Sequence, residues 1–573
     1  MAGIPVRRRA PLLVPLVLLL AVVALGGTGY IAYRLVFGSS DLHARMLPAD
    51  SDFYSTVLLD PPASQKVALL NLATRFPDVH NNNDTNKKLT DQANTALQSL
   101  GLKYQDDVQP WLGSQVSVGG KLGQLVGGSN PPDVVFLVAS KDDKKAVAAL
   151  DKARAHLTDL TWARHAHGGV DVWVGSAGQG PATAYAYIDH SVVLGTTEAT
   201  VDRVIDTDAG KVARLSDAKD FQDIVGKLPA EHFVLGYANV PSLVTKIKAA
   251  LNSGSVSNAG VKVTADQLKP LAAYRSAGFT LSAQSDRLVF DLKGGIDGSK
   301  LDSTTRDMIN AAAHQDTLLS YIPKGVFAAM GTTGVKGTVK QLQQAAQGQG
   351  DSASGGTSLL PSSVTDPNGA LSHLGNDFAA EIRPGGNLPS GGLVFQTNDP
   401  ASTTQLLEQL AQQFSPAEPA IEVTPPAGPG QLPTIVAKTP APRVETYRGI
   451  KITSLPASLA QPFQPAYAVG GGVAIVASST NQVKALIDTH ADHSDVTGSP
   501  EWTDASKGAT QPLETAFFVD IQRSLEGARE KLSGADLSNF NNSTRDAAPL
   551  RELFISSQAT TSGYSEQVVL VIR

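Results

Sequence analysis

The 573-residue chain contains no cysteine, which excludes disulfide bonds, thiolate chemistry and a cysteine-linked lipid anchor. Charged residues make up only 17% of the sequence and aromatic residues 6%. The net charge is −6, and no basic patch stands out, so we predict no nucleic-acid partner. Stability in such a chain must come from apolar cores, and the length allows more than one domain.

Catalytic and metal-binding motifs are also missing. His165 and His167 share one face of a predicted strand and His190 lies nearby, but a zinc site needs further ligands. Gly175 to Gly180 lacks the residues of a phosphate loop or a nucleophile elbow. His490 to His493 follow a predicted helix and are better explained as cationic capping residues. We therefore predict no catalytic residue, no cofactor and no metal site.

What the sequence does contain is one uncharged apolar run, from Ala10 to Tyr33. It is long enough to cross a bilayer, and Arg7, Arg8 and Arg9 precede it. The positive-inside rule then places residues 1–9 in the cytoplasm, residues 10–37 in the cell membrane as a single-pass anchor, and the rest outside. The residues predicted to form the anchor include Leu12, Leu16, Leu19, Val22 and Tyr30.

A cleaved signal peptide is the alternative interpretation of this run. Ala24-Leu25-Gly26 is a weak small-residue cleavage site. Under either interpretation the bulk of the chain is extracytoplasmic.

The exported part contains two similar segments. Ala184 to Leu194 and Ala466 to Val476 both read as strand, turn and strand, and a short helix follows each. Their turns, Asp189-His190 and Gly470 to Gly472, are residue types that suit hairpins. When the two units are aligned by sequence, Phe136 corresponds to Phe395. We therefore predict an α+β fold of two tandem, homologous units, each an antiparallel sheet with amphipathic helices.

The predicted unit boundaries are residues 41–299 and 301–573. Within the second unit, residues 347–369 are rich in Gly and Ser, and residues 415–443 are rich in Pro. Both segments are expected to be exposed loops. The pattern leaves open whether the two units share one sheet or form separate lobes.

Two short motifs resemble a known family. They are Leu47-Pro48-Ala49-Asp50 before an aromatic strand, and Pro110-Trp111-Leu112-Gly113 before a later strand. This pattern resembles the domain of unknown function 3352 family. The resemblance implies a membrane-anchored bacterial envelope protein of actinobacterial type, and it brings no known activity or ligand. From the residues alone, Trp111 is expected in a core, with a place in a ligand pocket as the alternative.

These observations favour a non-enzymatic, membrane-anchored envelope protein with a duplicated binding or scaffold domain. The expected partners are the membrane and an envelope protein, a lipid or a wall polymer. Two alternatives remain: a carrier of lipids or other hydrophobic ligands, and an envelope hydrolase with a site between the units. A deep apolar pocket would favour the carrier, and buried acidic or histidine side chains at the junction would favour the hydrolase.

Overall fold

The computed structural model describes the chain beyond the apolar run, in eleven ranges. These are residues 41–77, 82–122, 132–177, 183–252, 270–335, 373–385, 390–414, 420–424, 434–438, 442–456 and 464–573. No helix within these ranges has both the length and the apolar character needed to span a bilayer. The predicted anchor residues, and Arg7 to Arg9, lie outside the described residues, as does the Gly- and Ser-rich segment 347–369.

Ten strands come from the first predicted unit. They are β1 (Phe53–Leu58), β2 (Leu112–Lys121), β3 (Asp133–Ser140), β4 (Thr161–His167), β5 (Val170–Ser176), β6 (Thr183–Ile188), β7 (Ser191–Gly195), β8 (Val234–Asn239), β9 (Tyr274–Gln284) and β10 (Arg287–Ile296). Ten more strands of the same large sheet come from the described part of the second. They are β11 (Ala328–Thr332), β12 (Leu374–Arg383), β13 (Ser390–Thr397), β16 (Arg443–Tyr447), β17 (Ile450–Ser454), β18 (Ala466–Gly470), β19 (Val473–Ala477), β20 (Thr515–Asp520), β21 (Leu550–Thr560) and β22 (Gly563–Ile572).

The helices lie between these strands. In the first unit they are α2 (Ala63–Ala73), α3 (Asn82–Leu97), α4 (Asp143–His156), α5 (Glu198–Asp208), α6 (Lys219–Val225) and α7 (Val240–Asn252). In the second they are α8 (Ser303–Ala312), α11 (Pro400–Phe414), α12 (Thr480–Ala491), α13 (Pro500–Ala505), α14 (Ile521–Arg529) and α15 (Gly534–Thr544). The α+β class is therefore confirmed.

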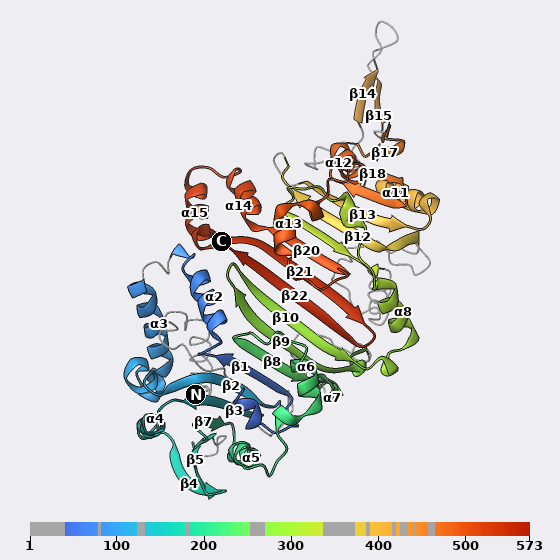
Figure 1. Cartoon of the computed structure of the whole chain (residues 1–573). Coiled ribbons are helices and arrows are strands. Elements are labelled where there is room, and N and C mark those ends of the chain that lie inside the picture. Colours follow the sequence, from blue (N-terminus) through green and yellow to red (C-terminus); the bar gives the residue numbers. More distant parts are fainter. Residues whose placement is uncertain are drawn as a thin grey trace, which may run out of the picture.

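All 20 strands belong to one sheet, and every pairing in it is antiparallel (Figure 1). From edge to edge the order is β4-β5-β6-β7-β3-β2-β1-β8-β9-β10-β22-β21-β20-β11-β12-β13-β19-β18-β17-β16. Outward from the β10–β22 pair, the two halves run through equivalent strands in the same order. The two units therefore share one sheet rather than forming two lobes.

Matching hydrogen bonds recur in the two halves. The isolated bridge between Pro48 and Arg214 has a counterpart between Pro323 and Asp495. The amide of Leu215 donates to Leu47, and the amide of Val496 donates to Ile322 in the same way. The equivalence is one of topology and register, and shared ancestry of the units remains a prediction.

The two halves meet through their last strands, β10 and β22. Arg287 lies opposite Val571, and Gly295 lies opposite Gly563. The pairing is symmetric: exchanging the two strands gives the same pairs of opposite residues. An approximate twofold axis therefore passes through the central pair, Asp291 and Gln567. We call this axis the pseudo-twofold axis.

One predicted correspondence is wrong by two residues. Phe136 lies opposite Leu194, whereas Phe395 lies opposite Ala474, so the residue equivalent to Phe136 is Leu393. A shift of two residues keeps every side chain on the same face of a strand, so the apolar pattern alone did not reveal the error.

The Pro-rich segment 415–443 was expected to be a loop, and this was partly wrong. It contains a separate hairpin, β14 (Ala420–Thr424) paired with β15 (Thr434–Lys438), which projects away from the large sheet (Figure 1). As expected, it does not join the sheet interior.

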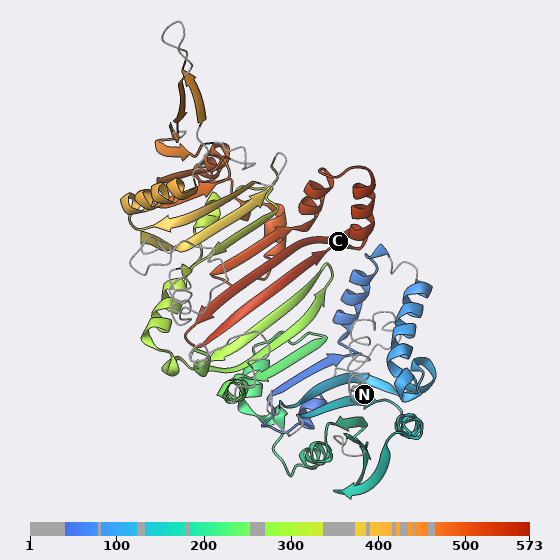
Figure 2. The same ribbon diagram turned by 180° about the vertical axis from the view of Figure 1, so that it is seen from behind.

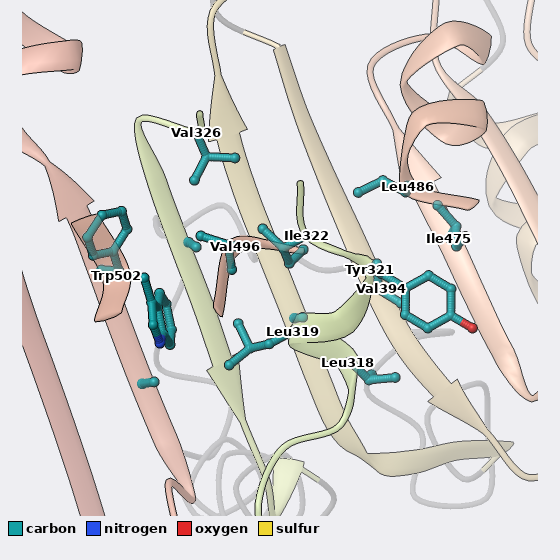
Figure 3. Close-up of a cluster of buried hydrophobic side chains, with 14 of the residues drawn as sticks. Leu318, Leu319, Tyr321, Ile322, Val326, Val394, Ile475, Leu486, Val496 and Trp502 are labelled. Carbon is teal, nitrogen blue, oxygen red and sulfur yellow. The ribbon is translucent and has the colours of Figure 1, made fainter. Parts of the chain in front are cut away.

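The sheet has two distinct faces. One, here the covered face, packs against α5, α6, α12 and α13 through two large apolar clusters. Figure 3 shows part of the cluster in the second unit, where Leu319 and Ile322 lie over the sheet near Val496, and Tyr321 lies near Val394. On the opposite face, α3, α4 and α11 pack toward the two ends of the strand order, and α2 packs against one end of the central strands β9, β10 and β22. Figure 2 shows the middle strands running between these helices.

Candidate functional site

The face opposite the covered face carries a continuous apolar row, and we call it the open face. Each residue of the row lies directly opposite the next in the strand ladders. The row is Val138, Val116, Val57, Val234, Leu281, Phe290, Val568, Ile555, Phe517, Met330, Ala380 and Leu393. It crosses twelve strands and passes beside the pseudo-twofold axis.

The side chains in the middle of this row are only half-buried. From Leu281 to Met330 the row's residues keep part of their surface accessible, whereas their neighbours along each strand, such as Val289 and Phe554, are buried on the covered face. Two apolar residues at the far end of the open face are exposed, Ile382 at 52% and Leu393 at 39%. Contiguous apolar surface that stays accessible in a folded protein marks binding sites.

A cavity opens on the same face at the other end of the row. It has a volume of about 120 Å³ and lies between α3, α4 and the sheet of the first unit. Its walls include Leu97, Trp111, Val138, Ala149 and Val192, all of which are buried. For comparison, an engineered cavity of about 150 Å³ with apolar walls stays dry and binds benzene. The cavity therefore suits the end of a hydrocarbon chain.

The family motif explains one wall of this cavity. Trp111 is 6% exposed, its indole Nε1 donates to the Asp107 carbonyl at 2.6 Å, and its ring belongs to the apolar cluster beneath α3 and α4. Pro110 precedes it in a turn, and Leu112 and Gly113 begin β2. The core and pocket interpretations of Trp111 both describe its position.

The glycine at position 113 of the motif is explained by steric crowding. A Cβ at this position would lie 2.7 Å from the backbone carbonyl carbon and oxygen of Ala139 on β3. Only glycine allows the two strands to approach this closely.

A few polar groups lie at the wall of the cavity. The Arg154 guanidinium stacks 3.5 Å above the Trp173 ring, donates to the Tyr185 hydroxyl at 3.0 Å and pairs with Asp151. Burial raises the pKa of Tyr185 to about 12, so its hydroxyl stays protonated. Trp162 packs edge-to-face on Tyr185, and its buried indole N–H has no hydrogen-bond partner in the part of the chain that the structure describes. An oxygen acceptor on a bound molecule would satisfy this donor.

The histidines considered as metal ligands are not brought together. His165 pairs with Glu198, His167 with Asp206 at 3.0 Å, and His190 with Asp143 at 2.9 Å. Among the described residues there is no group of three or more His, Cys, Asp or Glu side chains that could hold a metal ion.

The interpretation of His490 as a cationic cap needs correction. Its ring stacks on Tyr321 with centroids 4.0 Å apart, and burial together with nearby His493 lowers its pKa. A lowered pKa favours the neutral ring at neutral pH.

Sequence analysis missed the open face altogether. Each strand shows its own alternation of apolar residues, but the row exists only after eleven ladders set the strands in register. The signal that was available is that strands such as β10 are apolar on both faces, which the alternation Leu288, Phe290 and Leu292 against Val289 shows.

A comparison with models of protein families shows to which family the chain belongs. The family model described as "Protein of unknown function (DUF3352)" matches residues 12–418. The chain belongs to this family. The match spans the whole first unit and reaches α11 of the second, so the open face and the cavity both fall largely within the DUF3352 region.

Other comparisons add little. No curated protein matches the chain. Among solved structures, crystal form III of TP0453 is 11% identical with a TM-score of 0.24, covering 48% of this chain and 87% of TP0453. Crystal form IV of TP0453 is 10% identical with a TM-score of 0.23, covering 44% and 79%. These scores are too low to carry an argument about this DUF3352 protein.

Proposed function

We propose that this protein is a non-enzymatic, membrane-anchored extracytoplasmic protein that binds the hydrocarbon part of a lipid on its open face. The observation that carries the proposal is the uninterrupted apolar row from Val138 to Leu393, half-buried at its centre and exposed at its end. Burying such side chains against a hydrocarbon chain contributes about 25 cal/mol for each Å² removed from water.

The positions of the cavity and of the predicted anchor indicate where on the open face a lipid would bind and where it would come from. A hydrocarbon chain lying on the Val138 end of the row reaches the apolar cavity beside Trp111, and the Trp162 indole N–H, which has no partner among the described residues, could donate to an oxygen acceptor there. An anchor over residues 10–37 would hold the sheet beside the outer surface of the membrane, where lipids are at hand. The proposed partner is therefore a membrane lipid.

The direct test is native mass spectrometry of the full chain, extracted in a mild detergent from its own membrane. We expect co-purifying lipid. Affinity is then measured with a fluorescent long-chain fatty acid on the delipidated protein. The double variant Ile382→Ser with Leu393→Ser should weaken binding about tenfold, because both side chains are exposed on the open face and lose apolar contact area.

The matched control is Val147→Ser on α4, whose side chain is 40% exposed and lies outside the row. It should bind the fatty acid as the wild type does. A second variant, Ala153→Leu, adds bulk at the half-buried wall of the cavity and should also weaken binding. The proposal is wrong if no lipid co-purifies and all of these variants bind the fatty acid alike.

The alternatives of an envelope scaffold and of an envelope hydrolase between the units remain predictions. At the junction of the two units, the described residues that line a cavity include the carboxylates Asp291 and Glu231 but no histidine. Two carboxylates can serve as general acid and base, so the hydrolase alternative stays a prediction.

A further inference from the structure

A second site lies on the covered face, at the pseudo-twofold axis. Here four polar residues face one another across four strands, in the order Thr280, Asp291, Gln567 and Ser556. The next residues on either side of this polar row are Leu235 and Ala516, both buried. The row thus interrupts an otherwise apolar surface.

The hydrogen bonds of the polar row are incomplete. Asp291 is 6% exposed, and the one hydrogen bond its carboxylate makes within the described residues comes from Gln567 Nε2, at 2.9 Å to Oδ1. Among the described residues, the buried Gln567 Oε1 and Thr280 Oγ1 atoms have no hydrogen-bond partner. No cation of the described residues lies within ion-pair distance of Asp291. Buried polar groups are nearly always hydrogen-bonded, so unfilled acceptors point to an absent donor.

The two central residues of the polar row, Asp291 and Gln567, line a cavity of about 520 Å³. Its walls come from α2, from the loop after α6, and from the equivalent loop after α13. Asp291 and Gln567 line it from below, and Gln65, Asn71, Ser282 and Ser285 line its sides. The volume falls within the usual range for small-molecule sites.

We propose that this cavity binds a saccharide, with Asp291 and Gln567 as acceptors for its hydroxyl groups. Hydroxyls both donate and accept, which suits an acceptor floor with amide and hydroxyl walls. The two lining carboxylates, Asp291 and Glu231, outnumber the single lining cation Lys507, so an anionic ligand such as a phosphate is disfavoured.

An ammonium ligand is the competing chemistry, because it also donates to a carboxylate. Aromatic faces are the usual partners of ammonium groups. None of the described residues that line this cavity is aromatic. The amide-rich walls therefore favour the saccharide.

The saccharide site and the lipid site depend on different side chains. Alternate residues of one strand show this: Asp291 faces the cavity, and Phe290 belongs to the apolar row. Failure of one proposal leaves the other intact.

The test uses the full chain in lipid nanodiscs and isothermal titration calorimetry with three probes: maltotriose, triacetylchitotriose and choline. We expect at least one trisaccharide to bind, and Asp291→Asn to weaken that binding at least tenfold. Asp536→Asn on α15 removes the same charge from an exposed position and should leave the affinity unchanged. Because the Asn side chain keeps the size of Asp, the fold is expected to persist, and circular dichroism checks it.

A second variant, Ser285→Trp, adds bulk at the cavity wall without removing a buried charge, and it should also block the trisaccharide. Choline binding in place of the trisaccharides, lost in Asp291→Asn, would overturn the ligand class. Failure of every probe to bind the wild type, or equal binding by Asp291→Asn, would overturn the site itself.

Discussion

Arg287 on β10 donates to both the backbone carbonyl and the carboxylate of Asp504, at 2.8 and 3.1 Å. The two residues belong to different units. Arg287 is 3% exposed and also pairs with Asp286, while Arg573 at the end of the chain reaches the same two carboxylates. A buried guanidinium thus joins the units beside their shared strands, and the pairing holds the pKa of Asp286 below its usual value.

Replacing Arg287 should loosen this junction. Arg287→Met keeps much of the apolar stem but leaves the two carboxylates with one cation between them, which we expect to cost about 3 kcal/mol of unfolding free energy. Denaturant unfolding measures the loss. Arg275→Met is the control, because that side chain is 54% exposed and its contact with Asp297 is 3.5 Å. An equal loss in both variants would contradict a special role for Arg287.

Because the Glu552 carboxyl group is buried, we expect the second unit to be less stable at alkaline pH. Burial raises the pKa of Glu552 to about 7, and its buried Oε2 atom has no hydrogen-bond partner in the described ranges. A carboxyl group with a raised folded pKa keeps its proton in the native state, so stability falls as pH rises from about 4.5 toward 7 and above.

The variant Glu552→Gln removes this charge. It should raise the unfolding free energy by about 1–3 kcal/mol at pH 8 and change it little at pH 4. Chemical denaturation at the two pH values gives the comparison. A stabilisation of the same size at both would show that the side chain's charge is not the cause.

Because the His43 ring is buried, we expect the first unit to lose stability as the pH falls, which is opposite to the behaviour of the second unit. The His43 ring is fully buried, lies 2.7 Å from the Ser117 hydroxyl, and burial lowers its pKa to about 3. Stability is then complete above the ordinary histidine pKa of about 6.5 and is lost as pH falls from there toward 3. At pH 5 the loss is about 2 kcal/mol.

Hydrogen exchange separates the two halves. Between pH 7.5 and pH 5, after correction for intrinsic rates, the amides of β1 and β2 should lose protection while those of β21 should gain it. The variant His43→Gln should remove the change in β1 and β2. Uniform behaviour of both halves would contradict the assignment of these two groups.

The family motif should matter for stability through packing. Trp111→Ala empties the wall of the apolar cavity and should cost about 3–5 kcal/mol, whereas Trp111→Phe should cost less. Gly113→Ala should also destabilise the protein, because its Cβ meets the Ala139 backbone at 2.7 Å. Thermal unfolding ranks the three variants, and a neutral Gly113→Ala would contradict the close approach.

The absence of cysteine allows a direct test of the predicted topology. Single cysteines introduced at Asp536, which is exposed on α15, and at Ala2 can be labelled on intact cells with a membrane-impermeant maleimide. We expect Asp536→Cys to react and Ala2→Cys to react only after the membrane is opened. Labelling of Ala2→Cys in intact cells would overturn the orientation.

Local patterning carried much of the fold. The apolar alternation and turn residues predicted the hairpin around Asp189 and His190, whose φ angles of 41° and 55° fit a two-residue turn. The start of α11 at Pro400, after the capping residue Asp399, also agrees with the residue types preferred there. At the start of α4, Asp142 is the cap and accepts from the Lys145 amide.

By itself, the sequence determined the strand and helix types, the antiparallel class, the repeated order of elements and the residues of the family motif, because these depend on neighbours along the chain. Only the tertiary structure decided that the halves join through β10 and β22 in one sheet. It also decided that Phe290 lies in an apolar row while Asp291, the next residue, faces a polar cavity. The physical reason is that both features depend on ladder register between strands far apart in the chain, which no local pattern encodes.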